Sequence, residues 1–158
     1  VMLSRHLRLE SSPLAAILKL PAYRKEEAEL YKASLSLLEA MGLAELARER
    51  ADSLPYGLQR KLEVARALGT EPKLLLLDEP ATGLSVKETL DMMGFILRVH
   101  KEFGLTILLI EHTMRVVMGI CPRIVVLSHG QTIAQGTPRQ IQHNPQVIEA
   151  YLGARRNA

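Results

Sequence analysis

The sequence predicts an α/β fold, a parallel core sheet with flanking helices. Two apolar runs, at residues 74–77 and 106–110, have the length of strands buried on both faces, and a segment with helical periodicity lies between them. A strand, a helix and a second strand in this order form a β-α-β unit with parallel strands and a right-handed crossover. Both runs end in polar residues. Because ligands of such sheets bind at the carboxyl ends of the strands, the sequence predicts a functional site at this edge.

The chain begins with a mixed segment, residues 1–23, that we interpret as a helix, a loop and a short helix because prolines interrupt it. A clearer helix is predicted from Glu26 to Met41, with acidic residues in its first turn and Gly42 after its end. Residues 43–50 are expected to continue as a short helix. The apolar stripe of the long helix consists of Leu30, Leu37, Leu38 and Met41.

Pro55 and Gly57 mark the start of the next predicted helix. A glycine at the amino end of a helix lets a phosphate group approach the backbone N–H groups, where the helix dipole is positive. Arg60 and Lys61 would add positive charge there. The other interpretation of this segment is a plain junction between a loop and a helix.

The first apolar run ends in two adjacent carboxylates, Asp78 and Glu79, followed by Pro80. Successive residues of a strand point to opposite faces, so that the two acids can take different roles. A divalent cation on phosphates needs a hard oxygen ligand, and a hydrolytic site needs a second carboxylate that orients or deprotonates water. The alternative is a core strand that runs into an acidic turn.

Ser85 and Glu88 form a predicted capping box for the helix that follows, which extends to about Glu102. Glu111 and His112 come directly after the second strand, so that we expect them at the same sheet edge as the two acids. The alternative role of this histidine is capping or packing. The residues of the helix that are expected to face the core are Leu90, Met93, Leu97 and His100.

The last part of the chain predicts small structural elements. Residues 113–118 form a short helix, and Ser128 to Gln131 connects two strands as a hairpin. Thr137 and Gln140 form a second capping box, and Asn144 precedes a proline that starts another short helix. We expect these elements to be structural.

The composition is that of an ordinary soluble globular protein, with 47% apolar and 23% charged residues in a chain of 158. This length suffices for one domain with a real core. The net charge of +3 is spread along the chain, and 4% aromatic residues without Trp do not provide the basic clusters and stacking residues of nucleic-acid binders. We therefore expect no nucleic-acid partner.

A single cysteine, Cys121, allows no internal disulfide and favours a reducing compartment, so that we interpret the protein as cytoplasmic. No apolar run approaches the roughly 18 residues of a membrane-spanning helix, and membrane association is expected through a partner. The chain contains no Gly-Lys-Ser or Gly-Lys-Thr after a glycine loop, the phosphate-binding motif expected before an acid-tipped strand. A nucleotide site in this chain alone would be incomplete.

Four segments resemble, in order, the motifs of ABC-type ATPases. Leu54 to Leu58 resembles the signature motif, Leu74 to Pro80 the Walker B strand, the turn through Ser85 the D-loop, and Ile110 to His112 the segment of the switch histidine. Four motifs in the right order with compatible spacing are strongly specific, and the match extends over nearly the whole chain. The resemblance implies a partial ABC-type nucleotide-binding domain with an added helical subdomain.

Further residues narrow the resemblance to the ATP-binding subunit of bacterial branched-chain amino acid importers; they lie at 56–60, 110–119 and 136–153. The first residues resemble the segment after the Q-loop of that subunit, so that we expect a C-terminal fragment lacking the Walker A motif and the Q-loop. By the same resemblance, residues 1–56 are the helical subdomain ending in the signature loop. Residues 57–158 are then the C-terminal part of the ATPase core.

The resemblance implies a role for each matching residue. Asp78 matches the ligand of Mg²⁺, Glu79 the general base that polarises the attacking water, and His112 the switch residue that contacts the γ-phosphate of ATP. The signature loop, which in the family caps ATP held by the opposite subunit, comprises Pro55, Tyr56, Gly57, Leu58 and Gln59. The D-loop comprises Ala81, Gly83, Leu84 and Ser85.

The signature loop departs from the family pattern, which carries Ser, Gly and Gln where this chain has Pro55, Tyr56 and Leu58. Pro55 has neither a hydroxyl nor an N–H group to offer to a phosphate. Gly57 keeps the backbone accessible.

The implied function is ATP hydrolysis that drives import through membrane permease subunits, with two ATPase subunits paired head to tail at the cytoplasmic face of the bacterial inner membrane. An extracytoplasmic substrate-binding protein is an indirect partner, and Arg5 to Tyr23 is expected to contribute to the permease contact. The alternatives are a lipopolysaccharide-exporter ATPase, a soluble DNA-repair or chromosome-associated ATPase, and a non-enzymatic fragment without nucleotide binding. We expect residues 1–158 alone to be inactive.

Overall fold

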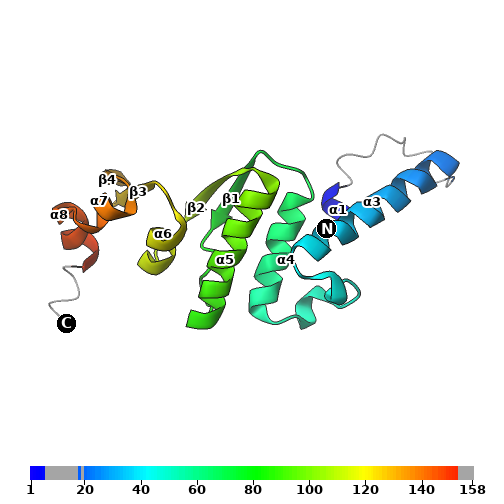
Figure 1. The fold of residues 1–158 in the computed structure, drawn as a ribbon, viewed down its shortest axis with the longest axis horizontal. Coiled ribbons are helices and arrows are strands. Elements are labelled where there is room, and N and C mark those ends of the chain that lie inside the picture. The colour runs from blue at the N-terminus through cyan, green and yellow to red at the C-terminus, as the bar shows by residue number, and fades with distance from the viewer. Residues whose placement is uncertain (6–17, 19, 153–158) are drawn as a thin grey trace. The chain divides into compact units, whose positions relative to one another are not determined.

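The computed structural model describes residues 1–5, 18 and 20–152, which belong to two compact units that divide after Leu109 (Figure 1). The predicted boundary between residues 56 and 57 concerns the roles of the segments and stays a prediction. The described chain is mixed helix and strand, with a small parallel sheet of two strands, which confirms the predicted fold class.

The elements of the first unit are α1 (Met2–Arg5), α3 (Pro21–Ala40), the 3-10 turns η2 (Ala44–Leu46) and η3 (Ala51–Ser53), α4 (Tyr56–Leu68), β1 (Leu74–Asp78), α5 (Val86–Phe103) and β2 (Thr106–Ile110), the last of which reaches the unit boundary. The elements of the second unit are α6 (Met114–Ile120), β3 (Ile124–Ser128), β4 (Gln131–Gly136), α7 (Pro138–Gln142), α8 (Pro145–Val147) and the π-helical turn η4 (Ile148–Leu152).

Helix α3 begins earlier than predicted because Pro21 occupies its first turn, where a missing N–H group leaves no helical hydrogen bond unmade. Its end follows the prediction. Gly42 takes a left-handed φ of 68°, and its N–H donates to the carbonyl of Glu39 at 2.9 Å. The predicted helix over residues 43–50 forms only the short turn η2, in which Leu46 donates its N–H to the carbonyl of Leu43.

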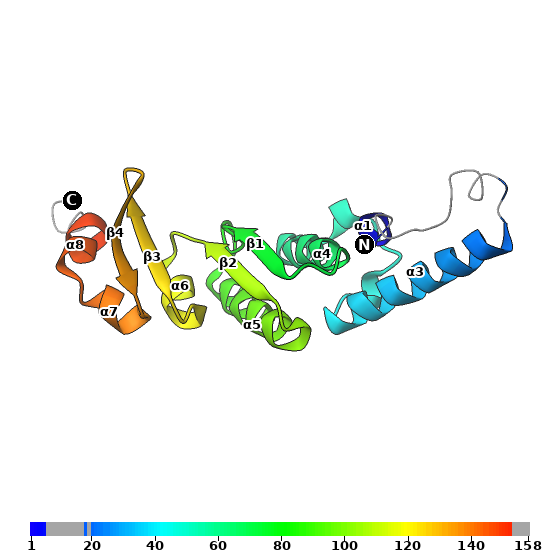
Figure 2. The ribbon, with the colours of Figure 1, turned by 90° about the horizontal axis from the view of Figure 1, so that it is seen from above.

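Strands β1 and β2 confirm the predicted pairing but not the predicted burial. In β1, Leu75 and Leu77 are buried, whereas Leu74 and Leu76 are 51% and 65% exposed. Leu108 of β2 is 55% exposed. Helix α5 lies along one face of the strands (Figure 2), and the described part of the chain leaves these three leucines on the other face uncovered. The prediction of strands buried on both faces is therefore wrong for this structure.

Helix α5 has the predicted ends but buries a different side. The capping box of Ser85 is present, and Gly104 ends the helix with a φ of 59°. Leu90, Leu97 and His100, which were expected in the core, are exposed. The buried residues are Thr89, Met92, Phe95, Ile96 and Val99. Because the helix is apolar on more than one side, its periodicity does not select the core face, and packing against α4 and the strands does.

The second unit is organised by the predicted hairpin, in which β3 and β4 pair antiparallel. His129 and Gly130 join the strands with φ angles of 49° and 77°, both positive as a two-residue type I′ turn requires. The core of the unit consists of Ile124, Ile141 and Val147. None of the described helices combines the length and the apolar character needed to cross a bilayer.

Candidate active site

The two acids predicted to carry chemistry lie where β1 ends. Asp78 is the last residue of the strand and is exposed, and Glu79 is half-buried with a left-handed φ of 45°. The hydroxyl of Thr82 donates to Oε2 of Glu79 at 3.0 Å, and the N–H of Thr82 donates to the carbonyl of Glu79 at 3.1 Å. A non-glycine residue in this conformation costs roughly 1–2 kcal/mol and is typical of functional sites.

The oxygen donors of Asp78 and Glu79 suit a hard cation such as Mg²⁺. Within residues 1–5, 18 and 20–152, no three His, Cys, Asp or Glu side chains gather into a cluster that could hold a metal alone. Mg²⁺ is usually bound by one or two carboxylates together with substrate phosphates. The pair therefore fits a cation that arrives with a phosphate ligand.

The predicted signature loop forms the start of α4. Pro55 is the N-cap residue and makes no side-chain capping bond, as its lack of a hydroxyl predicts. Its carbonyl accepts the N–H groups of Leu58 and Gln59 at 2.9 and 3.0 Å. The side-chain amide of Gln59 donates to the carbonyl of Leu54 at 2.7 Å, which holds the loop against the helix. The first N–H groups of a helix have no partner within the helix, and here they belong to Tyr56 and Gly57.

Tyr56 is held by its own helix. The guanidinium of Arg60 lies 5.0 Å from the centre of the tyrosine ring, and its Nη2 donates to the tyrosine hydroxyl at 2.5 Å. Nη1 of Arg60 donates to Oε2 of Glu63 at 2.8 Å. The hydrogen bonds to Glu63 and, secondly, to Tyr56 raise the pKa of Arg60 above its ordinary value, so that it stays charged.

The predicted D-loop lies against the signature loop within the first unit. Gly83 has a φ of 80°, and a Cβ atom added to it would lie 3.2 Å from Cε1 of Tyr56. The N–H of Leu84 donates to the carbonyl of Ala81, which is buried. The structure therefore brings together two segments, the loop at Pro55–Gln59 and the turn at Ala81–Ser85, that the sequence could only name separately.

Glu88 lies between the starts of α4 and α5. Its Oε2 accepts the N–H of Ser85 at 2.9 Å and the hydroxyl of Ser85 at 2.6 Å. These bonds lower the pKa of the Glu88 carboxyl below its ordinary value. A Cβ atom on Gly57 would touch Oε1 of Glu88 at 3.4 Å, so that the helix start at Gly57 packs directly on this carboxylate.

The predicted switch residue belongs to the second unit. His112 is exposed in the loop between β2 and α6, and the neighbouring carboxylate of Glu111 accepts the N–H of Thr113 at 3.4 Å. Asp78 and Glu79 belong to the first unit. The meeting of His112 with the two acids stays a prediction.

The sequence prediction missed Thr82, and it named Arg60 only as a positive charge and not as a partner of Tyr56. Thr82 binds Glu79 from three residues further along the chain, a spacing at which Thr side chains commonly bond to a turn. Arg60 binds Tyr56 across one helical turn, at the spacing where side chains of a helix meet. Both signals are local and could have been found in the sequence.

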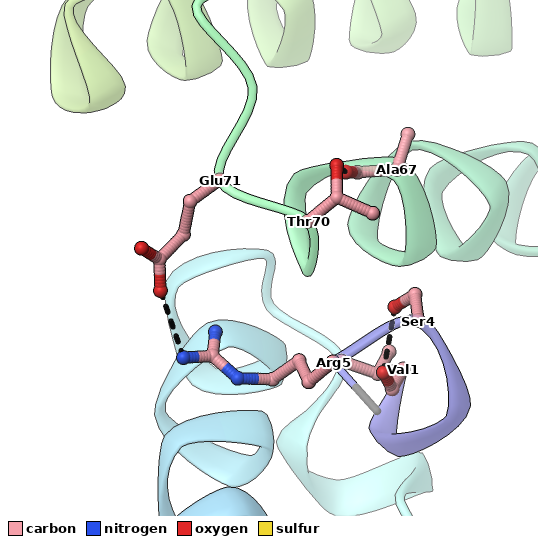
Figure 3. A network of polar contacts seen from close by, with 6 residues as sticks. All are labelled: Val1, Ser4, Arg5, Ala67, Thr70 and Glu71. Atoms are coloured by element: carbon pink, nitrogen blue, oxygen red, sulfur yellow. Dashed lines mark hydrogen bonds and ion pairs between the residues drawn. The ribbon is translucent and has the colours of Figure 1, made fainter. Parts of the chain in front are cut away.

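A groove of about 760 Å³ lies elsewhere in the first unit, between α1, α3 and the ends of α4 and α5. Arg5 lines it and bonds Oε1 of Glu71 at 2.9 Å, as Figure 3 shows. A Cβ atom on Gly69 would lie 2.4 Å from Oγ of Ser4, so that glycine is needed for α1 to approach α4. Of the predicted permease segment, Arg5 lines this groove, whereas residues 6–17 and 19 lie outside the described residues.

Family models match both parts of the chain. The model described as ABC transporter matches residues 4–82, which is half of the chain. The model described as branched-chain amino acid ATP-binding cassette transporter matches residues 131–156. The two matches include the segments predicted as signature loop and Walker B strand and the C-terminal hairpin strand with the helices that follow.

Individual proteins agree with the family models. The chain is 45% identical to the high-affinity branched-chain amino acid transport ATP-binding protein BraF of Pseudomonas aeruginosa and 44% identical to LivG of Escherichia coli K12, in each case over 97% of this chain and 60% of the relative. A crystal structure of an ATP-binding cassette of an ABC transporter in its ADP conformation matches 96% of this chain and 61% of that one, with a TM-score of 0.76 and 29% identity.

Proposed function

The chain belongs to the ABC transporter family, and from this premise we propose that the full-length protein is the ATP-binding and ATP-hydrolysing subunit of an importer, with branched-chain amino acids as the transported class. The chain spans 60% of the length of BraF and LivG, which are high-affinity branched-chain amino acid transport ATP-binding proteins. The single observation that carries the proposal is the acid pair Asp78 and Glu79 at the end of β1 in a chain so similar to these proteins. The exporter alternative finds no support among the relatives.

In this proposal Glu79, Asp78 and His112 each have a separate role in hydrolysis. Glu79 accepts a proton from the attacking water, and its left-handed backbone together with the bond from Thr82 orients the carboxylate. Asp78 holds Mg²⁺, which when bound would neutralise charge on the phosphates. His112 contacts the γ-phosphate. The exposed carboxylate of Asp78 and the exposed imidazole of His112 support these roles.

The uncapped start of α4 supports a role in binding ATP held by a second ATPase subunit. The N–H groups of Tyr56 and Gly57 are at the positive end of the helix dipole, where anions are stabilised. No side chain caps this start, which it has in common with the starts of α3 and α6, whereas the starts of α5, α7 and α8 are capped by Ser85, Thr137 and Asn144. A head-to-tail pair of subunits would close this start over the nucleotide.

The test of the hydrolytic role is the Glu79→Gln variant of the full-length protein. We expect nucleotide binding to persist and turnover to fall by about 10² to 10⁴, the usual effect of a positioned general base. Hydrolysis at the parent rate would show that Glu79 is not the base. Absence of hydrolysis in the parent protein, assembled with its transporter partners, would contradict the proposed function itself.

The groove beside Arg5 supports a contact with the permease subunits, which would hold the protein at the cytoplasmic face of the inner membrane and link it indirectly to a substrate-binding protein. Its floor includes the buried Leu37 and Leu68, and its rim carries Lys32 and Glu71. An apolar groove with a charged rim suits an amphipathic helix.

A photo-crosslinking residue tests this contact. Lys32 lines the groove, and its exposed neighbour Tyr31 on α3 does not. In the assembled transporter, a crosslinker at position 32 should capture a permease subunit, and one at position 31 should do so much less. Equal capture at both positions, or none at position 32, would place the permease elsewhere.

Residues 1–158 contain no Gly-Lys-Ser or Gly-Lys-Thr loop, which supports the expectation that this polypeptide alone is inactive. This polypeptide should bind Mg·ATP weakly and should not hydrolyse it. Titration with a fluorescent ATP analogue measures the affinity. A submicromolar dissociation constant would contradict this expectation, because it corresponds to more than about 8 kcal/mol of binding free energy without the phosphate loop.

A further inference from the structure

Tyr56 occupies the position at which the family signature pattern carries glycine. Its ring therefore packs against neighbours that a glycine would not contact. The ring lies over Gly83, and a Cβ atom at Gly83 would be 3.2 Å from Cε1 and 3.8 Å from both Cζ and the hydroxyl oxygen of Tyr56. A side chain at position 83 would therefore crowd the ring, and glycine leaves the ring its space. The ring of Tyr56 therefore lies beside the D-loop turn, on the side of Gly83 that carries no side chain.

The contact continues from Gly83 to the catalytic carboxylate. Gly83 follows Thr82 directly, and Thr82 bonds Glu79 twice, through its hydroxyl at 3.0 Å and through its N–H at 3.1 Å. Glu79 itself has the left-handed φ of 45°. A shift of Gly83 acts on Thr82 through the peptide bond that joins the two residues, and on Glu79 through the two hydrogen bonds from Thr82. The position of Gly83 therefore limits the positions open to Thr82 and Glu79.

The ring can act in this way because it is fixed from behind. Arg60 lies over the ring at 5.0 Å and bonds its hydroxyl, and Glu63 bonds Arg60 at 2.8 Å. Tyr56 is nevertheless 43% exposed, so that its ring adds little to the core. The ring is held at the surface by Arg60 and lies beside the turn at Gly83. This arrangement suits positioning of the turn better than stabilisation of the core.

We propose that Tyr56 is a positioning residue for hydrolysis: its ring holds the D-loop turn through Gly83 and thereby sets the place of the Glu79 carboxylate. This inference rests on the proposed function, because it assigns Tyr56 to the reaction for which Glu79 is the base. The signature loop would then have two roles. It would bind the nucleotide held by the opposite subunit, and through Tyr56 it would position the D-loop turn of its own subunit.

The experiment compares Tyr56→Ala with Tyr31→Ala in the full-length protein, in the steady-state hydrolysis of ATP. Tyr31 has a similar exposure, 49% against 43%, and lies on α3 away from the site. We expect Tyr56→Ala to lower kcat about tenfold with KM changed less than twofold, since small misplacements of catalytic groups mainly slow the chemical step. Tyr31→Ala should keep the parent values.

Two further variants decide how the ring acts. Tyr56→Phe keeps the ring beside Gly83 and under the Arg60 guanidinium and loses only the hydrogen bond to the hydroxyl, so that it should keep most of the parent kcat. Combining Tyr56→Ala with Thr82→Val should give a loss smaller than the product of the single losses, because both changes act through Glu79. Should Tyr56→Ala not fold, Tyr56→Leu, which keeps an apolar side chain but has no ring, replaces it in the same comparisons.

Three outcomes would overturn the inference. An unchanged kcat in Tyr56→Ala would show that the turn does not need the ring. A raised KM with an unchanged kcat would indicate direct nucleotide contact instead. Independent effects of the Tyr56 and Thr82 changes would show that Tyr56 does not act through the turn. In each case the parent protein still hydrolyses ATP, so that these results leave the proposed function intact.

Discussion

Glu79, which follows β1, and His129, which follows β3, have nearly the same left-handed backbone, with φ angles of 45° and 49°, in turns of different kinds. His129 is paired with Gly130 in a two-residue hairpin turn, and its conformation is what joins the two strands in register. Glu79 is in no hairpin. Its carboxylate instead accepts a hydrogen bond from the hydroxyl of Thr82 within the turn.

The two regions also share a capping box. The turn after β1 leads into α5 through Ser85 and Glu88, and the hairpin leads into α7 through Thr137 and Gln140. The boxes differ in charge, since only Glu88 can ionise. The comparison teaches that the same backbone devices serve strand pairing in one region and side-chain placement in the other, and four predictions test this difference.

The largest expected effect is a difference in ATP turnover between variants of Glu79 and of His129, the two residues with left-handed backbones. Glu79→Gly removes the carboxylate, and ATP turnover by the full-length protein should fall by about 10² to 10⁴. His129→Gly changes a residue with no proposed part in hydrolysis and should leave turnover at the parent value. The measurement is phosphate release under saturating Mg·ATP. A similar loss in His129→Gly would mean that the hairpin takes part in the reaction.

The capping boxes should contribute equally to stability. Ser85→Ala and Thr137→Ala each remove a hydroxyl that accepts a backbone N–H of the first helical turn. Each variant should lose about 1 kcal/mol of unfolding free energy, the usual value of such a cap. Urea unfolding measures the global loss, and hydrogen exchange of the α5 and α7 amides assigns it to the helix concerned. A loss in only one variant would show that the two boxes are not equivalent.

The same two glycine variants should be alike in stability although they differ in activity. Relief of a left-handed backbone, roughly 1–2 kcal/mol, is partly offset by the greater chain entropy of glycine, about 0.5–1 kcal/mol. We expect Glu79→Gly and His129→Gly each to gain roughly 0.5–1 kcal/mol. Midpoints of urea unfolding at constant m measure this gain. A destabilised Glu79→Gly would show that the carboxylate stabilises the turn, and would contradict the view that the turn only orients the carboxylate.

The smallest expected effect is a pH dependence confined to the first region. Hydrogen bonds from Ser85 lower the pKa of Glu88 in the folded protein. Its contribution is therefore complete above the ordinary glutamate pKa and is lost as the pH falls through the lower folded value. The neutral box at Thr137 has no such dependence. Acid titration of amide exchange should loosen the start of α5 before that of α7, and Ser85→Ala should remove the difference.

The start of α4 and the ends of α5 show what local sequence decides. Pro55 and Gly57 predicted a helix start, and Ser85 with Glu88 predicted a capped start for the next helix; the structure contains both, and Gly104 ends that helix near the predicted position. Such signals act between residues a few positions apart, so that no distant partner is needed to produce them. The order of the elements and of the family motifs was visible for the same reason.

Two features of the first unit depended on segments distant in the sequence. The leucines of β1 alternate between burial and exposure, and α5 buries the side with Met92 and Val99, not the predicted side with Leu90. Apolar residues on several sides of an element offer several possible faces. Which face is buried depends on what packs against it, and an apolar run does not contain that information.

By itself, the sequence of this protein determined the order of its main helices and strands, the capped helix starts at Ser85 and Thr137, and which carboxylates stand at the end of β1. Only the tertiary structure decided that the ring of Tyr56 lies beside Gly83 and that the carboxylate of Glu88 lies beside Gly57. The physical reason is the distance along the chain over which each kind of interaction acts. Backbone preferences and caps act within one or two turns of chain, whereas packing joins residues that are far apart in sequence and meet only when α4 and α5 lie side by side.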